Sequence, residues 1–281
     1  WETWLAEDRI TGFDLVREVP MRLAHGPLGA GTRLVWSFHH ILLDGRSFPD
    51  VLADVFDAYE AFQAGRTPEI TARPDRRPFL DWLEAQDQEG SRAFWRDRLE
   101  GFSGTPTLVQ VPQVAHRWGN AELVLASEES ARLRQACEGL GVSLAVLIEA
   151  AWALLLARYT DHEDVCFGVV RAGRKGSPVV DTEAMLGVFI NNVPLRLRLG
   201  GLTGRGLLDA VARFHREVRP HERLPLTEIQ KTVPGLPSPP FDTQVVYDRE
   251  GLQGAVHRLR PGLRDIRFTL LEQPPFAVTL Y

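Results

Sequence analysis

A strand, a tight connection and a helix follow one another between residues 33 and 65. The run from Arg33 to Phe38 is rich in β-branched and aromatic residues and leads directly into His39-His40, so it predicts a strand. Asp44-Gly45 supplies turn chemistry, and Ser47 begins a stretch whose apolar residues repeat on one helical face as far as Gly65. A strand that turns directly into an amphipathic helix limits this part of the chain to a fold that mixes the two.

In the rest of the sequence, stretches whose apolar residues repeat with the period of a helix are interspersed with stretches that have the pattern of a strand. We expect helices over residues 79–86, 91–99, 127–140, 143–157 and 206–218, and strands over 122–125, 165–170, 193–199, 241–247, 266–271 and 276–281. In detail, we expect caps at Ser127 and Ser143, a buried stripe of Leu133, Cys137 and Leu140, and a half-buried strand at 193–199. The order lacks a strict strand–helix–strand rhythm, so a mixed α/β sandwich is expected. Two glycines and two prolines between Gly101 and Pro112 indicate a lobe boundary.

Composition excludes several classes of protein. The 281 residues allow one large domain or two lobes, and the net charge of −5 gives no electrostatic basis for binding nucleic acid. The most apolar stretch, residues 144–157, contains Glu149 and is too short to cross a bilayer, so no membrane partner is expected. Cys137 and Cys166 are expected to be small core residues in a reducing compartment, and no signal peptide is visible, which favours a cytoplasmic protein.

The stretch from His39 to Gly45 carries the chemistry. Adjacent residues of an extended segment point to opposite sides, so His39 and His40 cannot easily share a metal ion, and no metal is expected. One imidazole can face a cavity and transfer protons near neutral pH, although a histidine beside an apolar strand is more often a satisfied core residue. Asp44 could orient that imidazole, or it could be a buried carboxylate that needs a cation. Gly45 permits a turn that a residue with a β-carbon would resist.

His39-His40-x-x-x-Asp44-Gly45 resembles the signature of condensation domains of nonribosomal peptide synthetases, which belong to the chloramphenicol-acetyltransferase-like superfamily. Four later blocks are similar to that family in content and order, namely residues 79–83 with 94–99, residues 167–174, residues 186–196 and residues 221–226. In the third of these blocks Asn192 stands where the family usually has Thr.

The resemblance implies two chloramphenicol-acetyltransferase-like lobes in a V, with the histidine motif in a tunnel between them. Residues 1–103 would be the C-terminal part of the N-lobe, and residues 104–281 would be the C-lobe, truncated near its C-terminal end. Because His39 lies so close to Trp1, we expect the first lobe to be incomplete, and because Tyr281 follows a strand that continues into more sheet and helix in the family, we expect the same of the second. We further expect these 281 residues alone not to fold into an active enzyme.

The implied activity is that of an acyltransferase that condenses a carrier-bound acyl or aminoacyl thioester with the amine of a second carrier-bound amino acid. Donor and acceptor peptidyl carrier proteins and adjacent synthetase domains would be the partners, with substrates on 4′-phosphopantetheine arms and no cofactor bound directly. The resemblance makes His40 the general base or the group that positions the amine, with His39 supporting the loop. It makes Asp44 structural, in an ion pair with Arg174 from the other lobe, while the alternative for Arg174 is a solvated charge beside Lys175.

Trp36, Ser47 and Asn191 are candidate tunnel-lining residues, and Asn191 could equally satisfy backbone groups at a strand end. His221 and Glu222 are expected in a surface loop. Two other functions stay open. The chain could be an ester-forming or free-standing acyltransferase of the same superfamily, or a non-catalytic condensation-like docking domain, which the intact motif disfavours.

Overall fold

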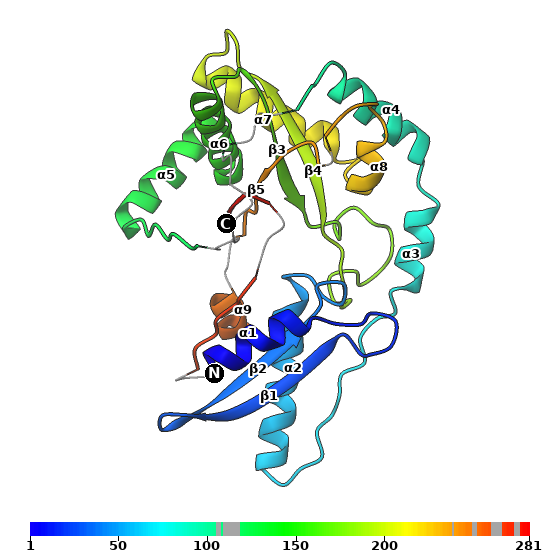
Figure 1. Cartoon of the computed structure of the whole chain (residues 1–281), viewed down its shortest axis with the longest axis vertical. Coiled ribbons are helices and arrows are strands. Elements are labelled where there is room, and N and C mark those ends of the chain that lie inside the picture. The colour runs from blue at the N-terminus through cyan, green and yellow to red at the C-terminus, as the bar shows by residue number, and fades with distance from the viewer. Residues whose placement is uncertain (105–107, 109–118, 238, 249–251, 260–265, 273–275) are drawn as a thin grey trace. The chain divides into compact units, whose positions relative to one another are not determined.

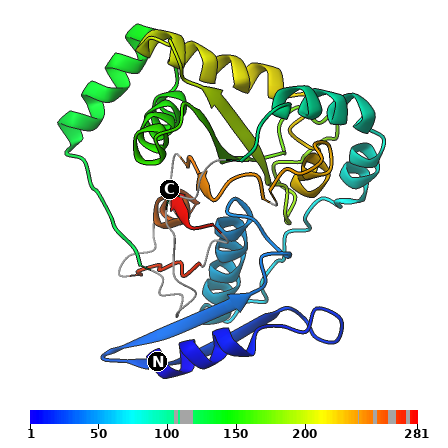
Figure 2. The ribbon, with the colours of Figure 1, turned by 45° about the horizontal axis from the view of Figure 1, so that its top comes forward.

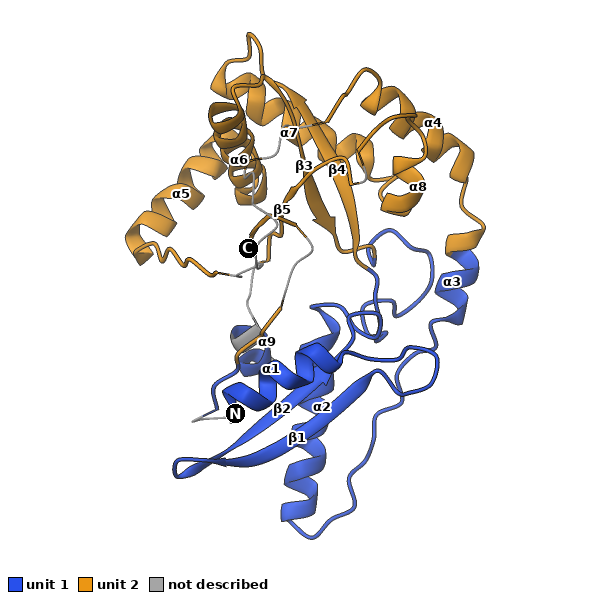
Figure 3. Cartoon of the chain, in the orientation of Figure 1, with its two compact units in different colours: residues 1–82, 174–189, 250–268 blue, residues 83–173, 190–249, 269–281 orange. Residues whose placement is uncertain are grey.

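The computed structural model describes residues 1–104, 108, 119–237, 239–248, 252–259, 266–272 and 276–281. The chain forms two compact units (Figure 3), the first from residues 1–82, 174–189 and 250–268 and the second from residues 83–173, 190–249 and 269–281. These units do not coincide with the single division expected after residue 103. The chain leaves the first unit after Trp82 and contributes two later segments to it, because packing joins segments that are distant in sequence.

The first unit is built around a hairpin and a long helix. Strands β1 (Met21–Leu28) and β2 (Gly31–Phe38) pair antiparallel, with Met21 opposite Phe38. Helix α2 (Ser47–Gln63) follows, helix α9 (Leu252–Leu259) packs against it, and helix α1 (Glu2–Thr11) opens the chain (Figure 1). The strand and helix expected on either side of the histidine motif are confirmed as β2 and α2. The sequence patterns did not predict α1, which buries no residue, or β1, which contains Gly26 and Pro27.

Helix α3 (Arg77–Glu84) leads the chain into the second unit, where helices α4 (Gln88–Leu99), α5 (Ser127–Leu140), α6 (Leu144–Thr160), α7 (Gly204–Val218) and α8 (Leu226–Gln230) accompany one sheet (Figures 1 and 2). The strands of that sheet are β3 (Asp164–Arg171), β4 (Asn191–Arg198), β5 (Thr243–Val245) and β6 (Val278–Leu280), in the order β4-β3-β5-β6. The β3–β4 pair is antiparallel and the other two pairs are parallel, so the sheet is mixed.

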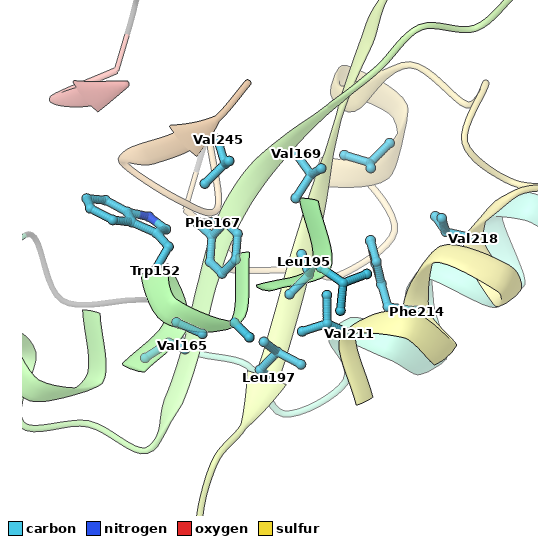
Figure 4. Close-up of a cluster of buried hydrophobic side chains, with 14 of the residues drawn as sticks. Trp152, Val165, Phe167, Val169, Leu195, Leu197, Val211, Phe214, Val218 and Val245 are labelled. Atoms are coloured by element: carbon cyan, nitrogen blue, oxygen red, sulfur yellow. The ribbon is translucent and has the colours of Figure 1, made fainter. Parts of the chain in front are cut away.

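The core of the second unit lies where α6 and α7 pack with the β3–β4 pair (Figure 4). Val165, Phe167 and Leu195 of the strands and Val211 of α7 are fully buried, which explains the continuous apolar runs in the sequence. Ser143 caps α6 as expected, since its Oγ accepts the Val146 N–H at 3.3 Å. Although its sequence is apolar on nearly every face, α6 is exposed on one side, where three large side chains reach solvent, namely Leu154, Leu155 and Tyr159.

Other expectations need correction because pairing and packing override local pattern. Residues 122–125 and 266–271 form no strand. Helix α5 begins at Ser127 with Ala126 as its cap residue, and of its expected stripe only Cys137 is buried, while Leu133 and Leu140 are exposed. Strand β4 is buried on both faces instead of one. Its Arg196 can be buried because the guanidinium donates two hydrogen bonds to the Asp164 carboxylate, at 2.9 and 2.6 Å.

Both cysteines are buried, as expected of core residues. Among the described residues no single helix has the length and apolar content needed to cross a membrane. Within the part of the chain that the structure describes, α5 and α6 taken together, bent by 97°, have the required length and composition.

Candidate active site

The connection from β2 to α2 is a pair of backbone turns that presents the histidine motif. The His39 N–H donates to the Pro20 carbonyl at 2.9 Å, and the Leu42 N–H donates to the His39 carbonyl at 3.1 Å. The Ser47 N–H then donates to the Asp44 carbonyl at 2.9 Å, which closes the turn that starts α2. The loop is therefore tied to the hairpin at one end and to the helix at the other.

Asp44 is a fully buried carboxylate with a cationic partner. Arg174 Nη2 lies 2.8 Å from Asp44 Oδ1, and the two residues are 1% and 0% exposed. Asp44 Oδ2 accepts the Phe189 N–H at 3.0 Å, and Oδ1 also accepts the Ser47 N–H at 3.1 Å. Of the two interpretations of Asp44, the structure contains the buried carboxylate that needs a cation, with additional hydrogen bonds of the kind that make such burial tolerable.

Arg174 belongs to the same compact unit as Asp44 and not to the other one, in contrast to the expectation. Its Nη1 donates to the carbonyls of Thr182 at 3.0 Å and Met185 at 2.7 Å, and its guanidinium lies 3.9 Å from the centre of the Phe189 ring. The alternative of a solvated charge beside Lys175 is wrong, because Arg174 is enclosed by the segment that follows it in the chain.

Ser47 is enclosed by the same cluster. Its Oγ lies 3.0 Å from Asp44 Oδ1 and 3.0 Å from the Gly187 carbonyl oxygen, and it accepts the Gly187 N–H at 3.1 Å and Arg174 Nη2 at 3.0 Å. With 1% of its surface exposed, Ser47 holds the loop together and does not line an open space, which corrects its expected place in a tunnel wall.

The two histidines of the motif are both exposed, so neither is a satisfied core residue. His39 Nδ1 accepts the Ile41 N–H at 3.1 Å, so this ring supports the loop and its proton lies on Nε2 in the neutral form. The His40 ring meets the buried Phe48 ring edge to face, with centroids 6.1 Å apart. Phe48 contacts Phe38, which in turn contacts the partly buried Trp36, and these three rings form an aromatic row behind His40. His40 thus reaches solvent next to a partly buried aromatic row.

The second unit contains Asn191 and a buried cluster that the sequence patterns did not reveal. Asn191 Nδ2 donates to the carbonyls of Glu222 at 2.8 Å and Leu224 at 2.7 Å, so Asn191 satisfies backbone groups at a strand end. Glu222 is buried and pairs with Arg171, which corrects its expected place in a surface loop. One signal for this cluster was present in the sequence, since Glu149 is a lone charge within the most apolar stretch and must find a partner. Among the described residues no three potential ligands gather to hold a metal ion.

A family model with the description Condensation domain matches residues 1–266. The chain belongs to the condensation-domain family. This condensation domain is 33% identical over 256 residues to surfactin synthase subunit 3 of Bacillus subtilis (strain 168), covering 89% of the chain and 20% of that relative. It therefore spans about one fifth of the length of that synthetase.

Two solved structures support the same fold. The first condensation domain of the CDA synthetase matches with a TM-score of 0.71 and 24% identity, covering 89% of this chain and 58% of that one. The X-domain from teicoplanin biosynthesis matches with a TM-score of 0.69 and 28% identity, covering 83% of this chain and 56% of that one. The condensation domain thus has the mixed α/β fold of its family.

The glycine of the motif is not required by the backbone. Gly45 has no positive φ, and a β-carbon placed on it would have no heavy atom within 4 Å, which corrects the expectation of a glycine-dependent turn. We therefore expect Gly45→Ala to leave the free energy of unfolding unchanged or to raise it by up to about 1 kcal/mol, measured by urea titration. A loss of more than about 1 kcal/mol would show that the turn does need glycine. Gly187→Ala is the matched destabilising control, since Gly187 has a φ of +142° and its added β-carbon would collide with Arg76.

His221 is expected to make the free energy of unfolding depend on pH in the acid range. Its ring stacks on Phe94 with centroids 4.2 Å apart, and burial lowers the pKa of His221 from its ordinary value of 6.5, although the nearby Asp87 opposes this shift. Below about pH 6.5 the unfolded chain binds a proton that the folded chain resists, so stability falls as the pH drops through this value. We expect His221→Gln to lose less stability than the wild type between pH 7 and pH 5 in urea titrations. An equal loss in the two proteins would contradict this, and His162→Gln serves as the exposed-histidine control.

Proposed function

We propose that this condensation domain joins a carrier-bound acyl or aminoacyl thioester to the amine of a second carrier-bound amino acid, forming an amide bond. The intact His39-His40-x-x-x-Asp44-Gly45 motif carries this proposal. Its exposed His40 sits on a loop whose Asp44 is buried against Arg174, so an accessible imidazole is combined with a fixed backbone. Such a combination suits a group that must meet a substrate in one geometry.

In this proposal the acceptor nitrogen attacks the thioester carbonyl carbon, the C–N bond forms, and the C–S bond breaks to release the donor thiol. His40 accepts a proton from the attacking amine or holds that amine by a hydrogen bond. His39 supports the loop through its bond to the Ile41 N–H, and Asp44 with Arg174 holds the loop in place. A thioester is already activated, so positioning contributes heavily beside proton transfer.

The partners in this proposal are a donor and an acceptor carrier protein, each presenting its substrate on a phosphopantetheine arm, together with neighbouring synthetase domains. The membership of the family and the similarity to surfactin synthase support this context. We also propose that each compact unit corresponds to part of a chloramphenicol-acetyltransferase-like lobe, and that the protein acts in the cytoplasm.

A docking function is the second candidate, and one observation favours it. The X-domain from teicoplanin biosynthesis is among the similar structures, and so is a complex of the X-domain with OxyB. By analogy this condensation domain would recruit a partner enzyme without catalysis. An ester-forming acyltransferase is the other alternative, because the motif does not distinguish amine from alcohol acceptors.

One assay separates these functions. The full-length protein is incubated with a donor thioester on one carrier protein and either an amine or a hydroxyl acceptor on a second, and products are identified by mass spectrometry. We expect amide product with the amine acceptor. Ester product with the hydroxyl acceptor alone would support the ester-forming alternative, and absence of any product would support docking.

A further inference from the structure

Four charged or titratable side chains form a continuous chain of hydrogen bonds in the second unit. His215 Nε2 of α7 lies 2.6 Å from Glu149 Oε2 of α6, and His215 Nδ1 lies 2.8 Å from Arg171 Nη1 at the end of β3. Arg171 Nε and Nη2 each lie 2.7 Å from Glu222 Oε2. Glu149 is 1% exposed and Glu222 is 6% exposed, so the carboxylates at the two ends of this series of hydrogen bonds are buried.

The chemistry of arginine fixes the protons in this network. A guanidinium has only donors, so His215 Nδ1 must be the acceptor of the bond from Arg171. The single proton of a neutral imidazole then lies on Nε2, which donates to Glu149. Arg171 thus pairs directly with Glu222 and, through the ordered imidazole, supports the buried carboxylate of Glu149. The Arg171 guanidinium therefore orders the other three groups.

Arg171 also occupies a particular place in the topology. It pairs with Asn191 in the last matched position of the β3–β4 ladder, and Asn191 holds the carbonyls of Glu222 and Leu224. Both strand ends are therefore fastened to the same short segment, residues 222–224. Between these strand ends runs the segment 172–190, which contains Arg174.

We propose that Arg171 is a positioning residue for the amide-forming reaction, because it fixes the strand end at which the segment 172–190 begins, only three residues before Arg174 binds Asp44. The proposal rests on the proposed function. Arg174, Gly187 and Phe189 of this segment are the groups that contact Asp44 and Ser47. A shift at the root of the segment would displace the backbone on which the loop of His40 depends, and displacements of about 1 Å can cost roughly 100-fold in rate.

The test uses Arg171→Met, the double variant Arg171→Met with Glu222→Met, and Arg171→Lys in the full-length protein. The double variant removes both members of the buried pair and so avoids leaving Glu222 without a cation. We expect kcat for amide formation to fall roughly 10- to 100-fold in the single and double variants, with Arg171→Lys recovering part of it. Arg205→Met is the control, since Arg205 forms an exposed pair with Asp209 on α7.

The second readout is the ¹⁵N NMR spectrum of His215. In the wild type we expect an unprotonated Nδ1 and a protonated Nε2. In Arg171→Met we expect the chemical shift of Nδ1 to change, because this nitrogen loses its hydrogen-bond donor. A folded double variant with wild-type kcat, or an unchanged His215 spectrum in Arg171→Met, would overturn the proposal, and so would failure of both variants to fold. If the wild type makes no amide, the proposed function fails, and the His215 spectrum still decides whether Arg171 orders the network.

Discussion

Replacing Asp44 with alanine should lower the free energy of unfolding by about 3 to 5 kcal/mol. The reason is the environment of its partner, because Arg174 is 1% exposed and would be left as a buried charge without a counterion. The substitution also leaves the Phe189 N–H without its acceptor, while the Ser47 N–H keeps only the Asp44 carbonyl. Urea titration of the two proteins measures the difference.

A matched control and a second variant make the Asp44 prediction specific. Asp54 pairs with Arg73 in the same unit, but both side chains are partly exposed, so Asp54→Ala should cost only about 1 kcal/mol or less. Combining Asp44→Ala with Arg174→Met should cost less than the sum of the two single changes, because the double variant leaves no unpaired charge. If Asp44→Ala kept the wild-type stability and lost turnover, Asp44 would have to be assigned a catalytic role.

Replacing His40 with alanine should lower the rate of amide formation by about 10² to 10⁴. In the proposed function the exposed His40 imidazole takes a proton from the amine or holds it, whereas the His39 ring accepts the Ile41 N–H of its own loop. Because the ring is exposed, the free energy of unfolding should change by no more than about 0.5 kcal/mol. Single-turnover assays with loaded carrier proteins measure the rate, and urea titration measures the stability.

His25→Ala provides the control for His40, since His25 is an exposed histidine on β1 of the same unit and lies outside the motif. This variant should retain wild-type turnover. His39→Ala should have a smaller effect than His40→Ala, because the His39 ring supports the loop through one hydrogen bond. Wild-type turnover in His40→Ala would remove His40 from the chemistry and would favour the docking function.

The part of the fold around the motif could be predicted because its signals are local. The apolar run before His39 and the helical repeat after Ser47 each lie inside the element that they predict. Both elements are present, as β2 and α2. The expected strands at 122–125 and 266–271 carried similar apolar signals but form no strand. A strand exists only where a partner strand supplies hydrogen bonds, and a single stretch of sequence does not contain that information.

The sequence by itself determined the family, the motif and the requirement that Asp44 and Glu149 find partners if they are buried. The resemblance paired Asp44 with Arg174, 130 positions away, and the structure contains that pair. Only the tertiary structure decided that Glu149 has His215 as its partner, 66 positions away. It also decided that Ser47 is enclosed, that Gly45 needs no special backbone, and that Glu222 is buried. The physical reason is that the cost of a buried charge is set by every group around it, and those groups are brought together by packing and not by proximity along the chain.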